Sequence, residues 1–104
     1  MPTEIHPTAL IEKTVQLDDD VSVGPFCILK DGVKVGKGTR LVSGVIVEGK
    51  TEIGENCVVH PFATIGLPPQ DTKYKGEETG VRIGSGNTIR EYVSIHRGSV
   101  SGDG

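Results

Sequence analysis

The side chains best suited to catalysis or metal binding are few in this chain of 104 residues. Three histidines, His6, His60 and His96, and two cysteines, Cys27 and Cys57, are widely separated along the sequence. A zinc enzyme needs three convergent ligands, and no two of the histidines are close together. Two cysteines are also too few for a disulfide framework or a cysteine zinc site. We therefore expect no metal and no cofactor.

Charged and polar residues gather instead in the segment 67–82, LPPQDTKYKGEETGVR. This segment contains the pair Pro68-Pro69, the glycines Gly76 and Gly80, and six charged residues. Prolines and glycines interrupt regular structure, and loops held by a rigid scaffold often carry binding residues. The composition predicts one loop that protrudes from a regular element.

The regular element is a repeat of six residues. An aliphatic residue occupies every sixth position, and after the loop the same register resumes. The series is Ile5, Ile11, Leu17, Val23, Leu29, Val35, Leu41, Val47, Ile53, Val59 and Ile65, followed by Ile83, Ile89 and Ile95. Four residues after each aliphatic one, the side chain is small or β-branched in almost every repeat. Cys27 and Cys57 occupy this small inward position, so we expect both in the core.

The residue before each small inward one marks a corner, because types that tolerate positive φ are frequent there. They are Asp20, Gly32, Gly38, Gly44, Asn56, Gly86 and Gly98. Prolines also recur at multiples of 18 residues, at Pro7, Pro25 and Pro61. Three hexads per coil account for both periods and predict an all-β fold, a parallel β-helix of triangular cross-section with almost no α-helix. One interior column should contain Ile5, Val23, Leu41 and Val59.

Charge and length exclude several classes of protein. With 11 Lys and Arg against 14 Asp and Glu, the net charge of -3 provides no basic face for nucleic acid. We also expect no signal peptide and no membrane span, and a reducing cytoplasm is the expected location. We expect one domain, 1–104, that leaves the repeat again at 101–104 without a cap, as in a chain cut partway along a solenoid.

Two motifs connect the repeat to a known family. Hexapeptide repeats of this kind are similar to those of the left-handed β-helix acyltransferases, so left-handed winding is implied by resemblance and not by the period. The segments QDTKYKGE at 70–77 and IREYVSIHRG at 89–98 resemble the acyl-carrier-protein:UDP-N-acetylglucosamine 3-O-acyltransferases of lipid A biosynthesis. The coil starts IHPTA and VGPFC are also similar to theirs. The resemblance covers essentially the whole chain, but only the N-terminal part of such an enzyme.

The resemblance implies transfer of a (3-hydroxy)acyl group from acyl carrier protein to the 3-hydroxyl of UDP-N-acetylglucosamine. By position, Gln70, Asp71, Lys73 and His96 would contact the nucleotide sugar. Lys73 offers a cation to the diphosphate and Asp71 accepts hydrogen bonds from sugar hydroxyls. His96 can donate to a phosphate or to the base. The family forms homotrimers and uses a later histidine as general base, so we expect this chain alone to be inactive.

Other interpretations remain open. A related N-acyltransferase of the same pathway is the nearest, although it normally has an additional N-terminal domain. The chain alone would otherwise be a noncatalytic β-helix segment. In a β-helical zinc enzyme the histidines must converge, whereas His6 and His60 would lie three coils, or about 14 Å, apart at ~4.8 Å per coil, and we expect both to be structural. The three loop residues could also be merely solvated, and His96 an outward strand residue.

Overall fold

The computed structural model describes residues 3–67 and 80–96, whose strands pair in parallel in three sheets. Sheet A contains β1 (Glu4–Ile5), β4 (Ser22–Val23), β7 (Arg40–Leu41), β10 (Val58–Val59) and β13 (Thr88–Ile89). Sheet B contains β2 (Leu10–Ile11), β5 (Ile28–Leu29), β8 (Ile46–Val47), β11 (Thr64–Leu67) and β14 (Ser94–His96). Sheet C contains β3 (Gln16–Leu17), β6 (Lys34–Val35), β9 (Lys50–Ile53) and β12 (Gly80–Ile83). The described part of the chain has no α-helix, as predicted.

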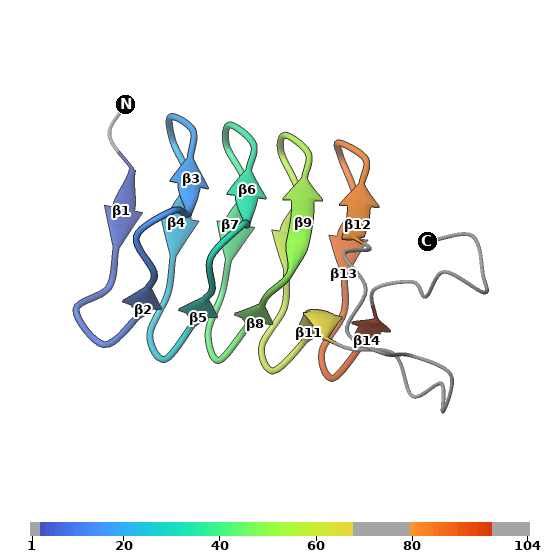
Figure 1. Cartoon of the computed structure of the whole chain (residues 1–104). Helices are drawn as coiled ribbons and strands as arrows, with labels where there is room; N and C mark the ends of the chain where they lie inside the picture. Colours follow the sequence, from blue (N-terminus) through green and yellow to red (C-terminus); the bar gives the residue numbers. More distant parts are fainter. Residues whose placement is uncertain (1–2, 68–79, 97–104) are drawn as a thin grey trace.

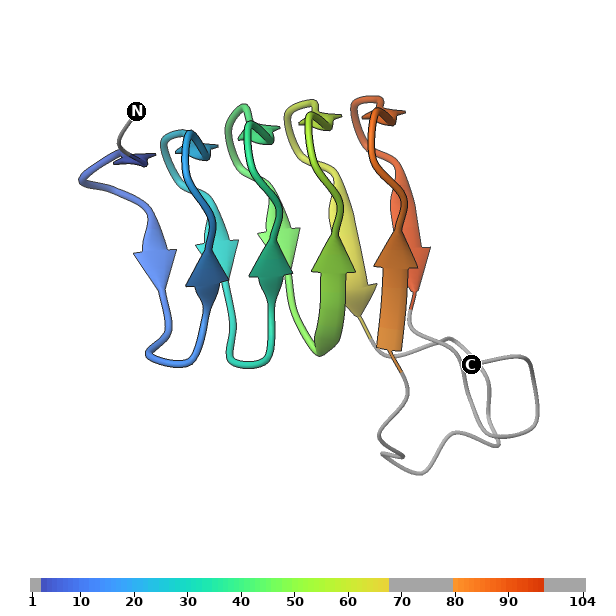
Figure 2. The same ribbon diagram turned by 90° about the horizontal axis from the view of Figure 1, so that it is seen from above.

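Consecutive strands belong to different sheets, so each coil passes once through sheets A, B and C. In Figure 1 the chain descends along sheet A behind and rises along sheet C in front, while it advances from left to right. This winding makes a left-handed parallel β-helix, as the resemblance implied. Figure 2 shows from above how the coils stack side by side along one axis.

The predicted interior column is present inside sheet A. Parallel pairing aligns its aliphatic residues in the order Ile5, Val23, Leu41, Val59 and Ile89. Val23 is 2% exposed, and Leu41 and Val59 are fully buried. Ile5 differs from the prediction, because it is 50% exposed. Among the described residues it has a neighbouring coil on one side only, so half of its surface stays open.

Small residues fill the remaining inward positions. Cys27 and Cys57 are both fully buried, as predicted, and both are free thiols. Burial raises the pKa of the Cys27 thiol. Thr39 is also fully buried, and its hydroxyl donates to the Gly54 carbonyl oxygen at 2.7 Å. The interior therefore accepts a polar side chain where a backbone acceptor is in reach.

The predicted corners have positive φ wherever the structure describes them. They are Asp20, Gly32, Gly38, Gly44, Asn56 and Gly86. Phe26, Phe62 and Tyr92 adopt the same conformation, which we did not predict because bulky residues rarely do. At these corners the backbone turns its N–H toward the preceding coil: Phe62 N–H donates to the Ser43 carbonyl oxygen at 3.1 Å. Corner hydrogen bonds thus join one coil to the next.

Regular strands extend into both ends of the predicted loop segment 67–82. Leu67 still belongs to β11, and Gly80–Ile83 forms β12, which pairs residue by residue with Lys50–Ile53 of β9. These backbone hydrogen bonds extend the regular coil into the expected loop. The insertion leaves from sheet B and returns in sheet C, at the corner between them. Residues 68–79 and 97–104, which include the second departure predicted at 101–104, lie outside the described residues.

Candidate functional site

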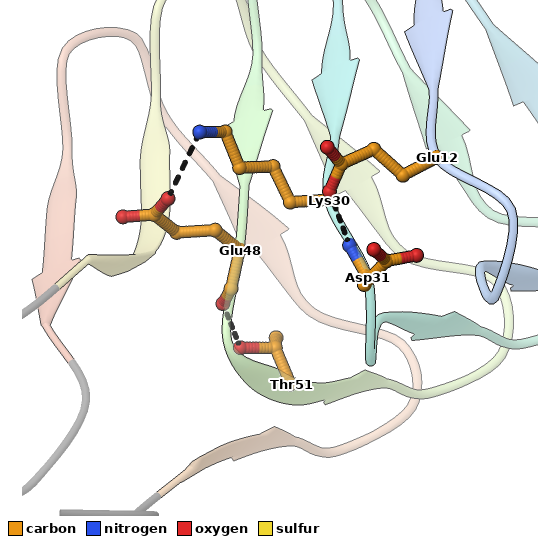
Figure 3. A network of polar contacts seen from close by, with 5 residues as sticks. All are labelled: Glu12, Lys30, Asp31, Glu48 and Thr51. Carbon is orange, nitrogen blue, oxygen red and sulfur yellow. Dashed lines mark hydrogen bonds and ion pairs between the residues drawn. The ribbon is translucent and has the colours of Figure 1, made fainter. Parts of the chain in front are cut away.

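Sheets B and C meet at a corner where polar contacts connect successive coils (Figure 3). Asp31 N–H donates to Glu12 Oε1 at 2.8 Å. From the same coil as Asp31, Lys30 Nζ lies 3.8 Å from Oε2 of Glu48 in the next coil. The Glu48 carbonyl oxygen accepts the Thr51 hydroxyl at 2.8 Å. Side chains from three coils therefore hold this edge of the β-helix.

Asp31 connects the turns of the first two coils at this corner by hydrogen bonds. Its Oδ1 accepts the Thr14 hydroxyl at 2.7 Å and the Thr14 backbone N–H at 3.0 Å. Gly32 N–H in turn donates to Thr14 Oγ1 at 3.0 Å. The Thr14 hydroxyl is the largest cause that lowers the pKa of Asp31, followed by the Thr14 N–H. Asp31 is thus an ionised acceptor at neutral pH.

The pairing of strands at this corner changes where the insertion begins. The register of β11 against β14 shifts after Ile65, so that Leu67 pairs with His96 and Gly66 forms a bulge. Gly66 has a φ of +83°, and a Cβ there would overlap the carbonyl oxygen of Glu48. Only glycine fits this position without a shift of the backbone. The bulge places the exit of the insertion directly beside His96.

His96 ends a line of side chains on the outer face of sheet B. Thr64 Oγ1 donates to Ser94 Oγ at 3.1 Å, and Ser94 Oγ lies 3.1 Å from His96 Nε2. Ser94 and His96 are two residues apart in β14, so their side chains share a face. Both are exposed. The arrangement presents to solvent an imidazole that a neighbouring hydroxyl orients.

The sheet C side of the corner carries two cations. A shallow hollow of about 360 Å³ is lined there by Lys50, Glu52, Gly80, Val81 and Arg82. Arg82 Nε lies 3.6 Å from Glu52 Oε2, and the Arg82 side chain is 81% exposed. Gly80 is the residue at which the described chain resumes after the insertion. Cations of this kind can attract an anionic group to the hollow.

The predicted ligand contacts divide between described and undescribed parts of the chain. His96 is exposed on sheet B, next to Leu67. Gln70, Asp71 and Lys73 lie outside the described residues. The structure thus places His96 opposite Leu67, the last described residue before the segment that contains the other three.

The two remaining histidines make contacts elsewhere. His6 Nδ1 accepts a hydrogen bond from the Thr8 backbone N–H at 3.1 Å, and His60 Nε2 accepts one from Arg90 Nη1 at 3.4 Å. Across residues 3–67 and 80–96, no three His, Cys, Asp or Glu side chains are grouped so that they could bind a metal ion. In the same ranges no helix is long and apolar enough to cross a membrane.

Thr64 and Ser94 were missed in the sequence, although a signal for them exists. They continue the outward column of sheet B, which pairing aligns in the order Leu10, Ile28, Ile46, Thr64 and Ser94. The column changes from aliphatic to hydroxyl residues at the coil that carries the insertion. Such a change in an outward column would have indicated a polar site.

Comparison with known proteins finds acyltransferases that are similar to this chain. No protein-family model matches the chain. The acyl-[acyl-carrier-protein]–UDP-N-acetylglucosamine O-acyltransferase of Thermodesulfovibrio yellowstonii is 62% identical over 101 residues, which are 97% of this chain and 39% of that protein. The chain is thus similar in sequence to part of this acyltransferase. The protein of the same name from Rickettsia canadensis is 48% identical over 100 residues, 96% of this chain and 38% of that protein.

Solved structures of these acyltransferases have the same fold. One UDP-N-acetylglucosamine acyltransferase superposes with a TM-score of 0.94 at 40% identity, covering 96% of this chain and 39% of that one. The protein from Acinetobacter baumannii superposes with a TM-score of 0.93 at 47% identity, covering 95% and 38%. The chain therefore spans about two fifths of the length of these acyltransferases. An alignment over 101 of the 104 residues also includes segment 67–82 and His96.

Proposed function

We propose that this chain forms the nucleotide-sugar side of a UDP-N-acetylglucosamine O-acyltransferase of lipid A biosynthesis. The reaction transfers a (3-hydroxy)acyl group from acyl carrier protein to the 3-hydroxyl of the sugar. The hydroxyl oxygen attacks the thioester carbonyl carbon, and the carbon–sulfur bond breaks. The products are a sugar ester and the carrier with a free thiol.

The pairing of Leu67 with His96 is the observation that carries the proposal. It puts the start of the insertion beside the one proposed ligand contact within the described residues. A chain extends at most about 3.6 Å per residue, so Gln70 and Asp71 are tethered within about 14 Å of Leu67. This tether supports a site that His96 and the loop residues share.

Each proposed residue has a role that suits a nucleotide sugar. Lys73 provides a positive charge for the diphosphate. Asp71 and Gln70 accept or donate hydrogen bonds at sugar hydroxyls and amides. His96 donates to a phosphate oxygen or to the base. In our proposal none of the four is the general base, and a histidine outside this chain removes the hydroxyl proton.

Assembly and location follow from the same proposal. The acyl donor is the thioester of acyl carrier protein, and the active form is a homotrimer with sites between subunits. Two free, buried thiols suit a reducing compartment, so we place the protein in the cytoplasm. Sedimentation that gives only monomer for the active protein would contradict the trimer.

Steady-state kinetics with UDP-N-acetylglucosamine and an acyl carrier protein thioester test the site. In the full-length protein, Asp71→Ala and His96→Ala should lower kcat/KM while the fold is retained. His6→Ala is the matched control, since His6 is also exposed but contacts Thr8 at the other end of the β-helix. Unchanged kcat/KM in both site variants would refute the assignment.

The 104-residue chain by itself provides a second test. We expect no turnover, since loss of a general base removes roughly 10²- to 10⁴-fold of the rate. Binding of UDP-N-acetylglucosamine to this chain should still be measurable by calorimetry. Turnover close to that of the full-length protein would show that the base lies within these residues.

A further inference from the structure

We propose that Thr64 and Ser94 are positioning residues that hold His96 in the tautomer with its proton on Nδ1. The ligand contact made by His96 rests on the function proposed above, whereas the tautomer does not. The structural basis is the line of polar atoms from Thr64 Oγ1 through Ser94 Oγ to His96 Nε2, with both separations at 3.1 Å.

Cooperativity gives the direction of the second hydrogen bond, since Ser94 Oγ has two lone pairs and its second one can also accept from a protonated Nε2. Thr64 donates its hydroxyl proton to Ser94 Oγ. A hydroxyl that accepts a hydrogen bond becomes a stronger donor, so we assign the Ser94 proton to the bond with His96 Nε2 at 3.1 Å. An Nε2 that accepts this proton must be unprotonated. In the neutral ring the proton is then on Nδ1, which becomes the donor.

The backbone fixes the geometry of this line. Thr64 and Ser94 are paired residues of adjacent strands, and their side chains lie on the same face. The bulge at Gly66 follows at once and brings Leu67, not Gly66, opposite His96. The histidine thus keeps its hydroxyl partners while the chain beside it departs into the insertion.

The other two histidines provide internal standards with defined tautomers. A backbone N–H can only donate, so His6 Nδ1, which accepts from Thr8, is unprotonated and the neutral ring is protonated on Nε2. Arginine also can only donate, so His60 Nε2 is the acceptor and the ring is protonated on Nδ1. The structure therefore predicts one Nε2–H ring and two Nδ1–H rings.

Nitrogen NMR of histidine-labelled protein measures the tautomers directly. The chain contains only three histidines, so His6→Gln, His60→Gln and His96→Gln assign the ring signals. At a pH where the imidazoles are neutral, we expect His96 in the Nδ1–H form. Ser94→Ala should shift it toward the Nε2–H form, and Thr64→Val should do so more weakly. Ser94→Thr keeps the hydroxyl and should preserve the Nδ1–H form.

The results separate positioning from ligand binding. Unchanged signals of His6 and His60 show that the variants are folded. If His96 is Nε2–H in the unaltered protein, or if Ser94→Ala leaves its tautomer unchanged, the positioning proposal is wrong. If the tautomer changes and UDP-N-acetylglucosamine binds about two- to ten-fold more weakly, both proposals are supported. If the tautomer changes and binding does not, positioning stands and the ligand contact of His96 fails.

Discussion

Phe62 and Tyr92 stack on each other at the corner between sheets A and B. Their ring centroids are 5.6 Å apart and the ring planes differ by 18°. Both backbones are left-handed, with φ of 64° and 60°, and the residues are 54% and 76% exposed. A left-handed residue with a Cβ costs roughly 1–2 kcal/mol. An aromatic pair contributes about 0.5–1.5 kcal/mol, so the stacking offsets part of the strain.

The strain at Phe62 predicts an unusual order of stability. Phe62→Ala removes the ring but keeps a Cβ at positive φ, whereas Phe62→Gly also removes the strain. We expect the glycine variant to be more stable than the alanine variant by up to about 1 kcal/mol. Denaturant unfolding of both proteins measures the difference. Val58, an outward strand residue, is the control, because there alanine should be the more stable.

Gly44 lies beneath the Phe62 ring and should be coupled to it. A Cβ on Gly44 would be 2.7 Å from Phe62 Cδ1, at a φ of +59°. We expect Gly44→Ala to cost roughly 2–4 kcal/mol, from the left-handed strain and overpacking together. In a Phe62→Ala background only the strain remains, so the cost should fall by about 1 kcal/mol or more. Additive effects in this double-mutant cycle would contradict the contact.

Gly66 should be less tolerant of substitution than a glycine of similar backbone geometry. Gly66 and Gly86 have φ of +83° and +76°. A Cβ on Gly66 would overlap the Glu48 carbonyl oxygen, but one on Gly86 would meet no atom within 4 Å. Gly86→Ala should therefore cost only the roughly 1–2 kcal/mol of strain. Gly66→Ala should cost clearly more by thermal unfolding, and equal losses would refute the tight packing at the bulge.

Part of the free energy of unfolding should depend on the ionisation of Asp31 at acid pH. Hydrogen bonds from Thr14 lower its pKa in the folded state. A lowered folded-state pKa means that this contribution is present above the unfolded value, about 3.9, and is lost as the pH falls through the folded-state pKa. Thr14→Val should raise the pKa of Asp31 toward its ordinary value, whereas Thr14→Ser should not. Carboxyl NMR titration distinguishes the two, and no change in Thr14→Val would contradict the prediction.

The hexad repeat was sufficient to predict a parallel β-helix, although not its left-handed winding, because each position in the repeat has a single physical requirement. Aliphatic residues such as Leu41 and Val59 occupy the inward position of the hexad. Gly44 and Asn56 occupy its corner position because they tolerate positive φ. Phe26 could not be recognised as a corner of the same kind, since its own preference opposes positive φ. Its position in the coil overrides that preference.

The candidate site was less accessible to sequence reasoning. His96 could be selected from a motif, but its partners Thr64 and Ser94 are 30 residues apart. Their meeting depends on the stacking of the coils on either side of the insertion, which a local motif does not show. The bulge at Gly66 depends likewise on the Glu48 carbonyl in the preceding coil, a contact that local sequence does not reveal.

The half-exposed Ile5 indicates that the first coil unfolds locally more easily than the central coils. In a solenoid each coil is stabilised by its immediate neighbours, so protection from hydrogen exchange should vary along the axis. Ile5 has one neighbouring coil among the described residues, whereas Leu41 is covered by Val23 on one side and Val59 on the other. Amides of the first coil should thus exchange through fraying, and those around Leu41 only when several coils separate together.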